Sequence, residues 1–426
     1  MSKTHKLTPR QRVEMVLRQE VPDKTPLTMY QGMVPQCVVE RQLRNNGLCI
    51  VRGCGVVKTT RPNVTTETRR YTENDQERVR TLIRTPVGEL TALDQPAVFT
   101  SWRLERLFKR PEDYKTLLFM INDQQHAPDY EPFAKAERTL GEDFILRAGI
   151  GATPLHEIMI HWMGHEAFAI EWAERRDEVL KLYDAMVEQQ RRIYHLVAQS
   201  PALHANYGGN EVPEVMGKER FEEYVVPLYN EAAEVFHKHG KLVGAHLDGN
   251  NRLWATAVAE SGLDYVEAFT PAPDTDMSVA DALAAWPGKV LWINFPSSLH
   301  LASIEKIEET TRQILSEAAP GNRLLIGITE DIPEDRWQAN MLAISRVMGS
   351  ALKIQKWGMH LTPVATPGMR PSGTRRSSRA RSAAPKGAEG SLRESSRAAG
   401  PRTPLPHRHR TSEKRDPSAS RTLRSG

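Results

Sequence analysis

The chain has 426 residues, of which 39% are hydrophobic, enough to bury a large core in one big domain or two ordinary ones. No run of about 18 apolar residues occurs, which argues against a membrane span, and the polar, basic residues 1–12 argue against a secretory signal and for the cytoplasm. The formal net charge is +4, but residues 359–426 carry 15 Lys or Arg against four Asp or Glu, which leaves residues 1–358 at −7. Such a body gives no reason to expect nucleic acid as its natural partner.

Short apolar runs alternate along residues 1–358 with longer stretches of helical periodicity. Strands alternating with helices indicate parallel βαβ units, and seven or more such units suit a closed barrel better than two dinucleotide-binding halves. We therefore predict an α/β fold, a single (β/α)8 TIM barrel. The expected strands are Pro26–Tyr30, Phe144–Ala148, His204–Tyr207, Lys241–His246, Tyr265–Phe269, Val290–Phe295 and Leu324–Ile328, and the clearest helices are Ala167–Gln199, Phe221–His239 and Ile304–Ala318.

Two segments depart from this alternation. Residues 31–140 are less regular and form an N-terminal insertion, in which the Thr- and Arg-rich stretch Thr59–Arg80 is expected to supply strands or loops at the barrel mouth. Residues 359–426 contain no Phe, Trp or Tyr and cannot bury enough apolar surface to offset their chain entropy. We predict a disordered basic tail there. It could be functionless, an out-of-frame product, or an arm that binds nucleic acid or anionic surfaces non-specifically.

In such a barrel, functional side chains lie at the carboxyl ends of the strands. The strand that starts at Lys241 runs into His246 and then Asp248, and imidazole and carboxylate are both ordinary zinc ligands. The alternative is a hydrogen-bonded turn with Asp248-Gly249 as its corner. From position alone, either interpretation is open.

Two acidic residues mark the next two candidate positions. Glu330 follows the last strand, where it could be a third metal ligand or a general base, or else an acid at a helix N-terminus. Glu267 lies inside an apolar strand, and a charge there needs either a partner or a function. The alternative for Glu267 is a buried ion pair.

The last candidates follow the strand that starts at His204. Tyr207 and Asn210 flank a Gly-Gly pair that would let a ligand approach the backbone, although a tight turn explains the same pattern. His161 and His165 stand four residues apart without the metalloprotease motif, so we interpret them as mouth-lining or surface histidines. The three cysteines match no zinc spacing and are expected to be free thiols: Cys37, Cys49 and Cys54.

An ordered set of short motifs resembles the uroporphyrinogen decarboxylase superfamily over roughly residues 7–350. The motifs are Asp23-Lys24-Thr25-Pro26, Thr85-Pro86-Val87-Gly88, Arg110-Pro111-Glu112-Asp113-Tyr114, Gly240 through Asn250, Glu267-Ala268-Phe269-Thr270-Pro271-Ala272-Pro273, and Gly327 with Ile332-Pro333. The resemblance implies a (β/α)8 barrel with a deep cavity at its mouth and a small-molecule substrate. It does not choose between the two reactions of the superfamily.

One branch of the superfamily decarboxylates tetrapyrroles in porphyrin biosynthesis and needs no cofactor. Its arginine-bearing segment after the first strand corresponds here to Met29 through Val34, where both arginines are missing. A polycarboxylate substrate needs such cations, because guanidinium pairs bidentately with carboxylate. Tetrapyrrole decarboxylation is therefore the secondary interpretation.

The other branch transfers methyl groups between a corrinoid and a thiol and binds zinc through an H-x-C motif and a distant Cys. The corresponding residues here are His246-Leu247-Asp248, and the distant Cys position is Ile328 with Glu330 close by. The resemblance thus implies a harder ligand set of His246, Asp248 and Glu330 for a divalent metal, zinc.

We accordingly favour metal-assisted methyl transfer with a corrinoid partner protein. Glu267, Tyr207 and Asn210 are expected to orient the substrate or move a proton. The alternatives are a tetrapyrrole decarboxylase and a catalytically inactive barrel that binds a small molecule.

Overall fold

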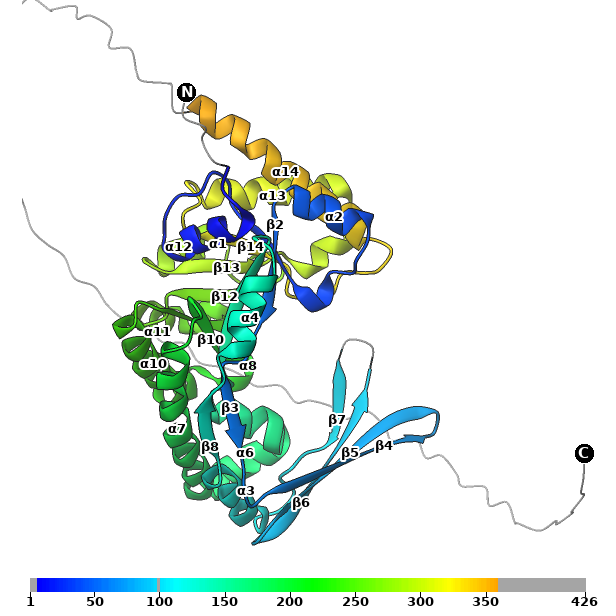
Figure 1. The fold of residues 1–426 in the computed structure, drawn as a ribbon, viewed down its shortest axis with the longest axis vertical. Coiled ribbons are helices and arrows are strands. Elements are labelled where there is room, and N and C mark those ends of the chain that lie inside the picture. Colours follow the sequence, from blue (N-terminus) through cyan, green and yellow to red (C-terminus); the bar gives the residue numbers. More distant parts are fainter. Residues whose placement is uncertain (1–5, 98–99, 359–426) are drawn as a thin grey trace, which may run out of the picture. The chain divides into compact units, whose positions relative to one another are not determined.

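The computed structural model describes residues 6–97 and 100–358, and eight parallel strands among them close into a barrel (Figure 1). Each strand pairs in parallel with its two neighbours, and β1 closes the ring by pairing with both β2 and β14. The (β/α)8 prediction is confirmed. The strands are β1 (Leu27–Tyr30), β2 (Leu48–Gly53), β9 (Phe144–Gly151), β10 (His204–Glu211), β11 (Leu242–Leu247), β12 (Tyr265–Phe269), β13 (Val290–Asn294) and β14 (Leu324–Gly327).

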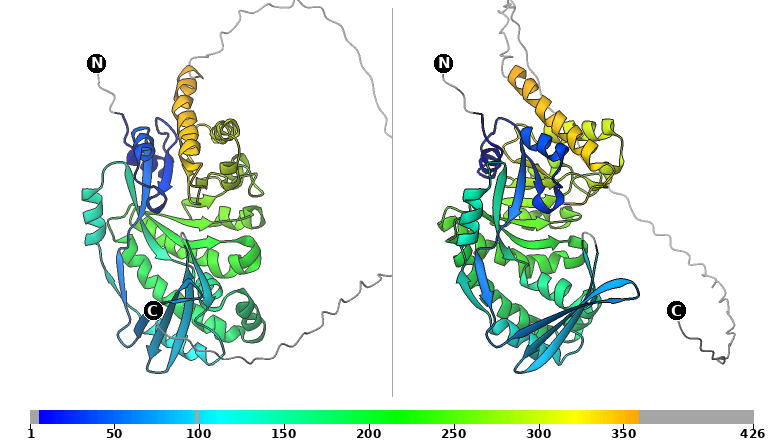
Figure 2. Two further views of the ribbon diagram at one scale, coloured as in Figure 1. Left: turned by 90° about the vertical axis from the view of Figure 1, so that its right-hand side faces the viewer. Right: turned by 45° about the vertical axis from the view of Figure 1, so that its right-hand side comes forward.

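Helices follow the strands and cover the outside of the barrel (Figure 2). Successive side chains on a strand point to opposite faces, so alternate residues of β11 such as Val243, Ala245 and Leu247 pack outwards, in the hydrophobic cluster shared with the helices. The helices in chain order are α2 (Val38–Asn45), α3 (Asp113–Asn122), α4 (Glu131–Thr139), α6 (His165–Glu174), α7 (Arg176–Ala198), α10 (Val226–Lys238), α11 (Ala255–Glu260), α12 (Val279–Ala285), α13 (Ile304–Glu317) and α14 (Trp337–Gly358).

The remaining side chains of the strands fill the barrel from its amino-terminal end. Tyr265 and Trp292 belong to a second, separate hydrophobic cluster together with Val16 and Leu17 of α1 (Pro9–Leu17). Helix α1 contacts β2, β9 and β14 and begins with a capping box at Thr8, so its apolar face covers this end of the barrel. The open end is therefore the carboxyl end of the strands.

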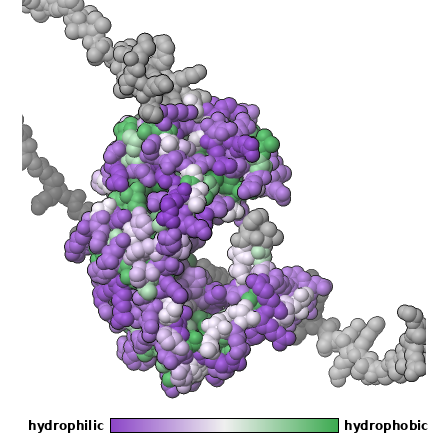
Figure 3. Space-filling view, in the orientation of Figure 1, coloured by the Kyte–Doolittle hydropathy of each residue, from purple (hydrophilic) through white to green (hydrophobic). Residues whose placement is uncertain are grey.

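The insertion between β2 and β9 contains two small antiparallel sheets. One pairs β3 (Val57–Thr60) with β8 (Gln125–Pro128), and the other is the meander β4 (Thr65–Glu73), β5 (Gln76–Thr85), β6 (Gly88–Pro96) and β7 (Ser101–Glu105). The four-stranded sheet packs on α3 through β5 and β6. Most residues of β4 are exposed, and the face in Figure 3 is mainly hydrophilic there.

Two predictions about elements were wrong. The predicted helix Ala167–Gln199 is two helices, α6 and α7, because the backbone leaves helical geometry at Arg175 (φ −136°, ψ 41°). No Gly or Pro marks this break, and the apolar periodicity continues across it. The eighth barrel strand, β2, lies in the stretch that was expected to be irregular.

Other expectations concern features outside the barrel itself. Cys37, Cys49 and Cys54 are free. Within the described ranges, the helices are too short or too polar to cross a membrane. The predicted tail, residues 359–426, lies outside the described residues, so the boundary at Gly358 stays a prediction.

The barrel floor offers a stability test. Leu17 packs against the barrel strands and is only 2% exposed. Because its truncation would leave a cavity, Leu17→Ala should lower the free energy of unfolding by about 2–5 kcal/mol. Leu253, which is 51% exposed, is the matched control, and Leu253→Ala should change it by less than about 0.5 kcal/mol. Urea unfolding of the two variants measures both values. Equal effects would contradict the assignment of α1 as the floor.

Candidate functional site at the barrel mouth

The carboxylate of Glu267 is the centre of a buried polar network. The residue is completely buried in β12 and accepts hydrogen bonds from Asn206 Nδ2 at 2.8 Å and from His246 Nδ1 at 3.1 Å. The Tyr30 hydroxyl and the Arg147 guanidinium donate to its other oxygen. Five strands, β1, β9, β10, β11 and β12, thus contribute one side chain each to a single point in the barrel.

Strand register explains this convergence. His246 and Glu267 are directly paired across β11 and β12, and Asn206 pairs with Gly244, two residues before His246. Each of these side chains takes the inward position of its strand. A register shift follows Glu267, and Ala268 adopts a left-handed backbone (φ 59°), a conformation uncommon for a residue other than glycine.

The charges of the network stabilise one another. Burial alone raises the pKa of Glu267, but the charge of Arg147 and the hydrogen bonds from His246 and Tyr30 outweigh it, so this pKa lies well below its usual value. Burial lowers the pKa of Arg147, and the charge of Glu267 more than restores it. The guanidinium also lies over the Tyr30 ring, 5.4 Å from its centroid. Glu267 is therefore ionised and Arg147 is already paired.

His246 connects this network to the mouth. Burial alone would lower the pKa of His246. The hydrogen bonds and charges of Asp248 and Glu267 outweigh that effect and raise the pKa to about 10. Its Nε2 lies 3.3 Å from Asp248 Oδ1, close enough for an ion pair, yet this nitrogen is buried without a hydrogen-bond partner among the described residues. The ring therefore presents one fixed nitrogen and one unsatisfied nitrogen.

The structure tests how well the predicted ligands fit a metal. His246 has a carboxylate beside each ring nitrogen, Glu267 at Nδ1 and Asp248 at Nε2. A metal ion could take the place of the Nε2 proton, because a ligating imidazole must lose that proton and Asp248 supplies an adjacent oxygen. Glu330 is solvent-exposed, but partial burial of its carboxyl group and, after it, the charge of Asp248 raise its pKa. Its carboxylate therefore lies close enough to Asp248 for the two charges to interact. Within the described part of the chain, however, no three His, Cys, Asp or Glu side chains are arranged to hold a metal. His246 and Asp248 fit as two ligands, and Glu330 is not in place as the third.

A cavity of about 580 Å³ adjoins the network and has Arg147 and Asn206 in its wall. Much of the remaining wall is backbone at the ends of β2, β9 and β10. A β-carbon added at Gly149 or Gly151 would meet no atom within 4 Å, so these glycines keep the space open. The glycines that line this cavity are Gly53, Gly55, Gly149, Gly151 and Gly208.

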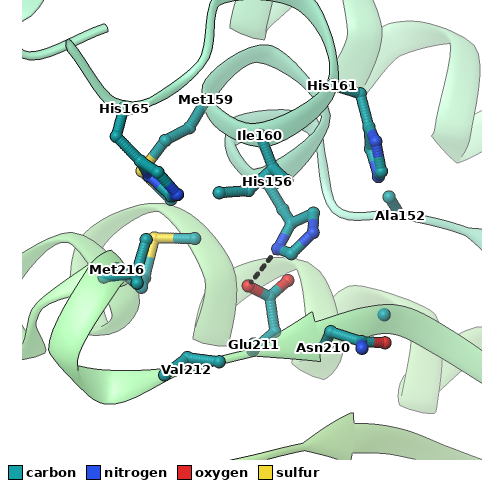
Figure 4. Close-up of a pocket in the computed structure, with 12 residues that line it drawn as sticks. Ala152, His156, Met159, Ile160, His161, His165, Asn210, Glu211, Val212 and Met216 are labelled. Atoms are coloured by element: carbon teal, nitrogen blue, oxygen red, sulfur yellow. Dashed lines mark hydrogen bonds and ion pairs between the residues drawn. The ribbon is translucent and has the colours of Figure 1, made fainter. Parts of the chain in front are cut away.

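The structure corrects the predicted placement of Tyr207 and Asn210. Tyr207 takes the outward position of β10, where it is fully buried and its hydroxyl bonds with that of Tyr194 at 2.7 Å and with Gln190. It therefore packs between the barrel and α7, away from Glu267. Asn210 lies at the mouth but lines a second cavity together with His161 and His165 (Figure 4).

Sequence reasoning missed three members of the network: Tyr30, Arg147 and Asn206. Arg147 gave a usable signal, because it interrupts the apolar run of β9 as Glu267 interrupts β12. Asn206 sits between two apolar residues of β10 and gave a weaker one. Tyr30 carried no charge to mark it.

The model of the uroporphyrinogen decarboxylase family matches residues 161–347, which include Asn206, His246, Glu267 and Glu330. Over that segment the chain is similar to the uroporphyrinogen decarboxylase family, in agreement with the resemblance inferred from its sequence motifs. This similarity does not fix a reaction.

Similarity to solved structures extends over the whole barrel at low sequence identity. A methyltransferase from Methanosarcina mazei is 12% identical with a TM-score of 0.51, over 81% of this chain and 99% of that one. A structure of the pneumococcal virulence factor StrH is 8% identical with a TM-score of 0.34, over 83% and 90% of the two chains. The search of curated proteins finds no match. The methyltransferase shares the fold, and the StrH likeness is too weak to support an argument.

The buried ion pair generates the second prediction. Glu267→Gln leaves the Arg147 charge uncompensated in the barrel and should lower the free energy of unfolding by about 3–5 kcal/mol. Adding Arg147→Met should restore part of that loss, which a double-mutant cycle in urea measures. The exposed pair Glu131–Arg138 is the control, and Glu131→Gln should cost less than about 1 kcal/mol. Additive effects of the two barrel substitutions would contradict the pairing.

The same pair predicts a pH dependence. Because the folded-state pKa of Glu267 is depressed, its contribution to stability is present above the ordinary pKa of about 4.3 and is lost as the pH falls towards the folded value. Wild-type stability should therefore decline more steeply on acidification below about pH 5 than that of Glu267→Gln. Parallel pH profiles from urea unfolding would contradict this.

Proposed function

We propose that this chain is a metal-assisted methyltransferase that receives its methyl group from a corrinoid partner protein. The observation that carries the proposal is the position of His246: Nδ1 is fixed by buried Glu267, while Nε2 is buried and faces Asp248 Oδ1 at 3.3 Å without a well-aligned hydrogen bond. Such a nitrogen is costly unless something binds it. A divalent metal, zinc, is the group that this donor pair suits.

In this proposal His246 and Asp248 hold the metal, and Glu330 moves in as the third ligand. When bound, a divalent metal lowers the pKa of a coordinated nucleophile and so supplies an attacking group at neutral pH. The ligand set of imidazole and carboxylates is harder than one with thiolates, which favours an oxygen-bearing methyl acceptor.

The protein's own groups orient rather than react. Glu267 is a positioning residue that fixes the ring and tautomer of His246, and it is held in turn by Arg147 and Asn206. The 580 Å³ cavity beside Arg147 and Asn206 takes the small-molecule substrate. The structural likeness to the Methanosarcina methyltransferase supports methyl transfer as the reaction class.

Tetrapyrrole decarboxylation is less well supported. A substrate with many carboxylates needs free cations in its cavity. Arg147 is the guanidinium in the wall of the 580 Å³ cavity, and one cation that is paired with Glu267 cannot balance many carboxylates. The charge balance of this site therefore favours the methyltransferase.

Metal analysis of the full-length protein tests the proposal. After incubation with zinc and dialysis, elemental analysis should find about one zinc per chain. Asp248→Ala removes a proposed ligand and should lower the metal affinity by more than the roughly 10- to 100-fold seen when a metal site loses a supporting group. His246→Ala should abolish retention. His195→Ala, on the exposed face of α7, is the matched control and should retain zinc like the wild type.

The outcomes separate the alternatives. Undiminished zinc in His246→Ala would exclude His246 as a ligand. A wild-type protein that retains no zinc would remove the metal proposal and leave a metal-free decarboxylase or an inactive barrel.

A further inference from the structure

A second cavity, of about 420 Å³, lies beside the first at the end of β10 (Figure 4). Its other walls come from the π-helix η2 (Glu157–Met163), the preceding turn α5 (Pro154–His156) and the short helix α8 (Pro213–Met216). π-helical turns are rare and often occur at functional sites. Ala152 lines both cavities, so the two are neighbours.

A buried carboxylate and an imidazole form one side of this cavity. Glu211 is completely buried, and its oxygens accept from Thr153 Oγ1 at 2.6 Å and from His156 Nδ1 at 2.9 Å. The second ring nitrogen of His156 points away from Glu211, towards the side of the cavity where Ala152 and His161 lie (Figure 4). Glu211 therefore orients His156 and leaves Nε2 available to a ligand.

The charges around His156 favour its protonated form. Burial lowers its pKa, but the hydrogen bond and charge of Glu211 outweigh this, so the pKa is raised overall. The charges of Glu157 and Asp248 act in the same direction. The His161 ring lies 5.6 Å away, and burial together with the charge of His156 lowers the pKa of His161. These charges thus favour a second proton on the ring of His156 and disfavour one on the ring of His161.

The remaining lining divides into a polar and an apolar part. Asn210, at φ 60°, and His165 add polar groups to the rim, while Met159 and Met216 form a buried apolar wall. Both oxygens of Glu211, the buried acid of the cavity, are already occupied by internal donors. An anion of modest size can therefore approach His156 and extend an apolar tail along the methionines.

We propose that this cavity binds a short aliphatic carboxylate, which accepts a hydrogen bond from His156 Nε2 and lays its apolar tail against Met159 and Met216. A charge-assisted hydrogen bond and an apolar wall are the usual elements of a small-molecule site. The inference goes beyond the proposed methyl transfer, because it depends neither on a metal at His246 nor on a corrinoid partner.

Butyrate is the probe, and its neutral isostere butyramide is the matched ligand. Isothermal titration calorimetry on the full-length protein should show butyrate binding about 10- to 100-fold more tightly than butyramide, the fold-change expected for a hydrogen bond to a charged group. Equal affinity for the two ligands, or no butyrate binding, would overturn the proposal without any variant.

Two variants assign the binding to His156. His156→Gln should weaken butyrate binding by about 10-fold or more, whereas His195→Gln, on the exposed face of α7, should not change it. Glu211→Gln removes the group that raises the pKa of His156, so the pH above which butyrate binding is lost should be lower in this variant than in the wild type. Butyrate affinity unchanged in His156→Gln would refute the assignment.

Discussion

The ionised carboxylate of Glu267, buried on the barrel axis, is the constraint around which the mouth is built. A charge without water is costly unless paired and fully hydrogen-bonded. A single strand cannot supply four donors, but a ring of strands can, and Tyr30, Arg147, Asn206 and His246 come from four of them. The closed barrel therefore makes this charge tolerable. The charge in turn fixes the orientation of the side chains that face the cavity.

This arrangement separates the roles of the two ends of the barrel. Below Glu267 the interior is packed with Tyr265, Trp292 and the apolar face of α1. Above it the walls become glycine backbone, with Gly149 and Gly151 where side chains would otherwise fill the space. The polar network is thus the boundary between a packed core and a cavity. It can be rigid because its lower side is close-packed.

Much of the barrel followed from periodicity alone, because most of its strands are largely apolar runs and its helices are amphipathic. The missed strand, β2, has a four-residue apolar core, Leu48–Val51, within a stretch that otherwise reads as irregular. The missed break at Arg175 has no sequence marker. Both failures concern local geometry that tertiary packing decides.

For the site, the search for polar residues at strand ends selected His246, Asp248 and Glu267, and the structure places both carboxylates beside His246. The same rule misplaced Tyr207, because a strand buried on both faces gives no sign of which residues face inward. Once one side chain is known to face the barrel interior, alternation along the strand fixes the direction of its neighbours. Because Asn206 points inward to Glu267, Tyr207 points outward, against α7.

The end of β10 explains why the mouth has two cavities rather than one. Tyr207 pairs with Ala245, and Glu211 pairs with Leu247. Strand β10 therefore advances by four residues over the length in which β11 advances by two. The extra residues form a bulge, in which Gly208 takes φ 87°. The bulge ends regular alternation and turns Glu211 away from the Glu267 network, towards His156. This local irregularity thus turns a second buried carboxylate towards a second histidine: Glu267 fixes His246 inside the barrel, and Glu211 fixes His156 beside the 420 Å³ cavity.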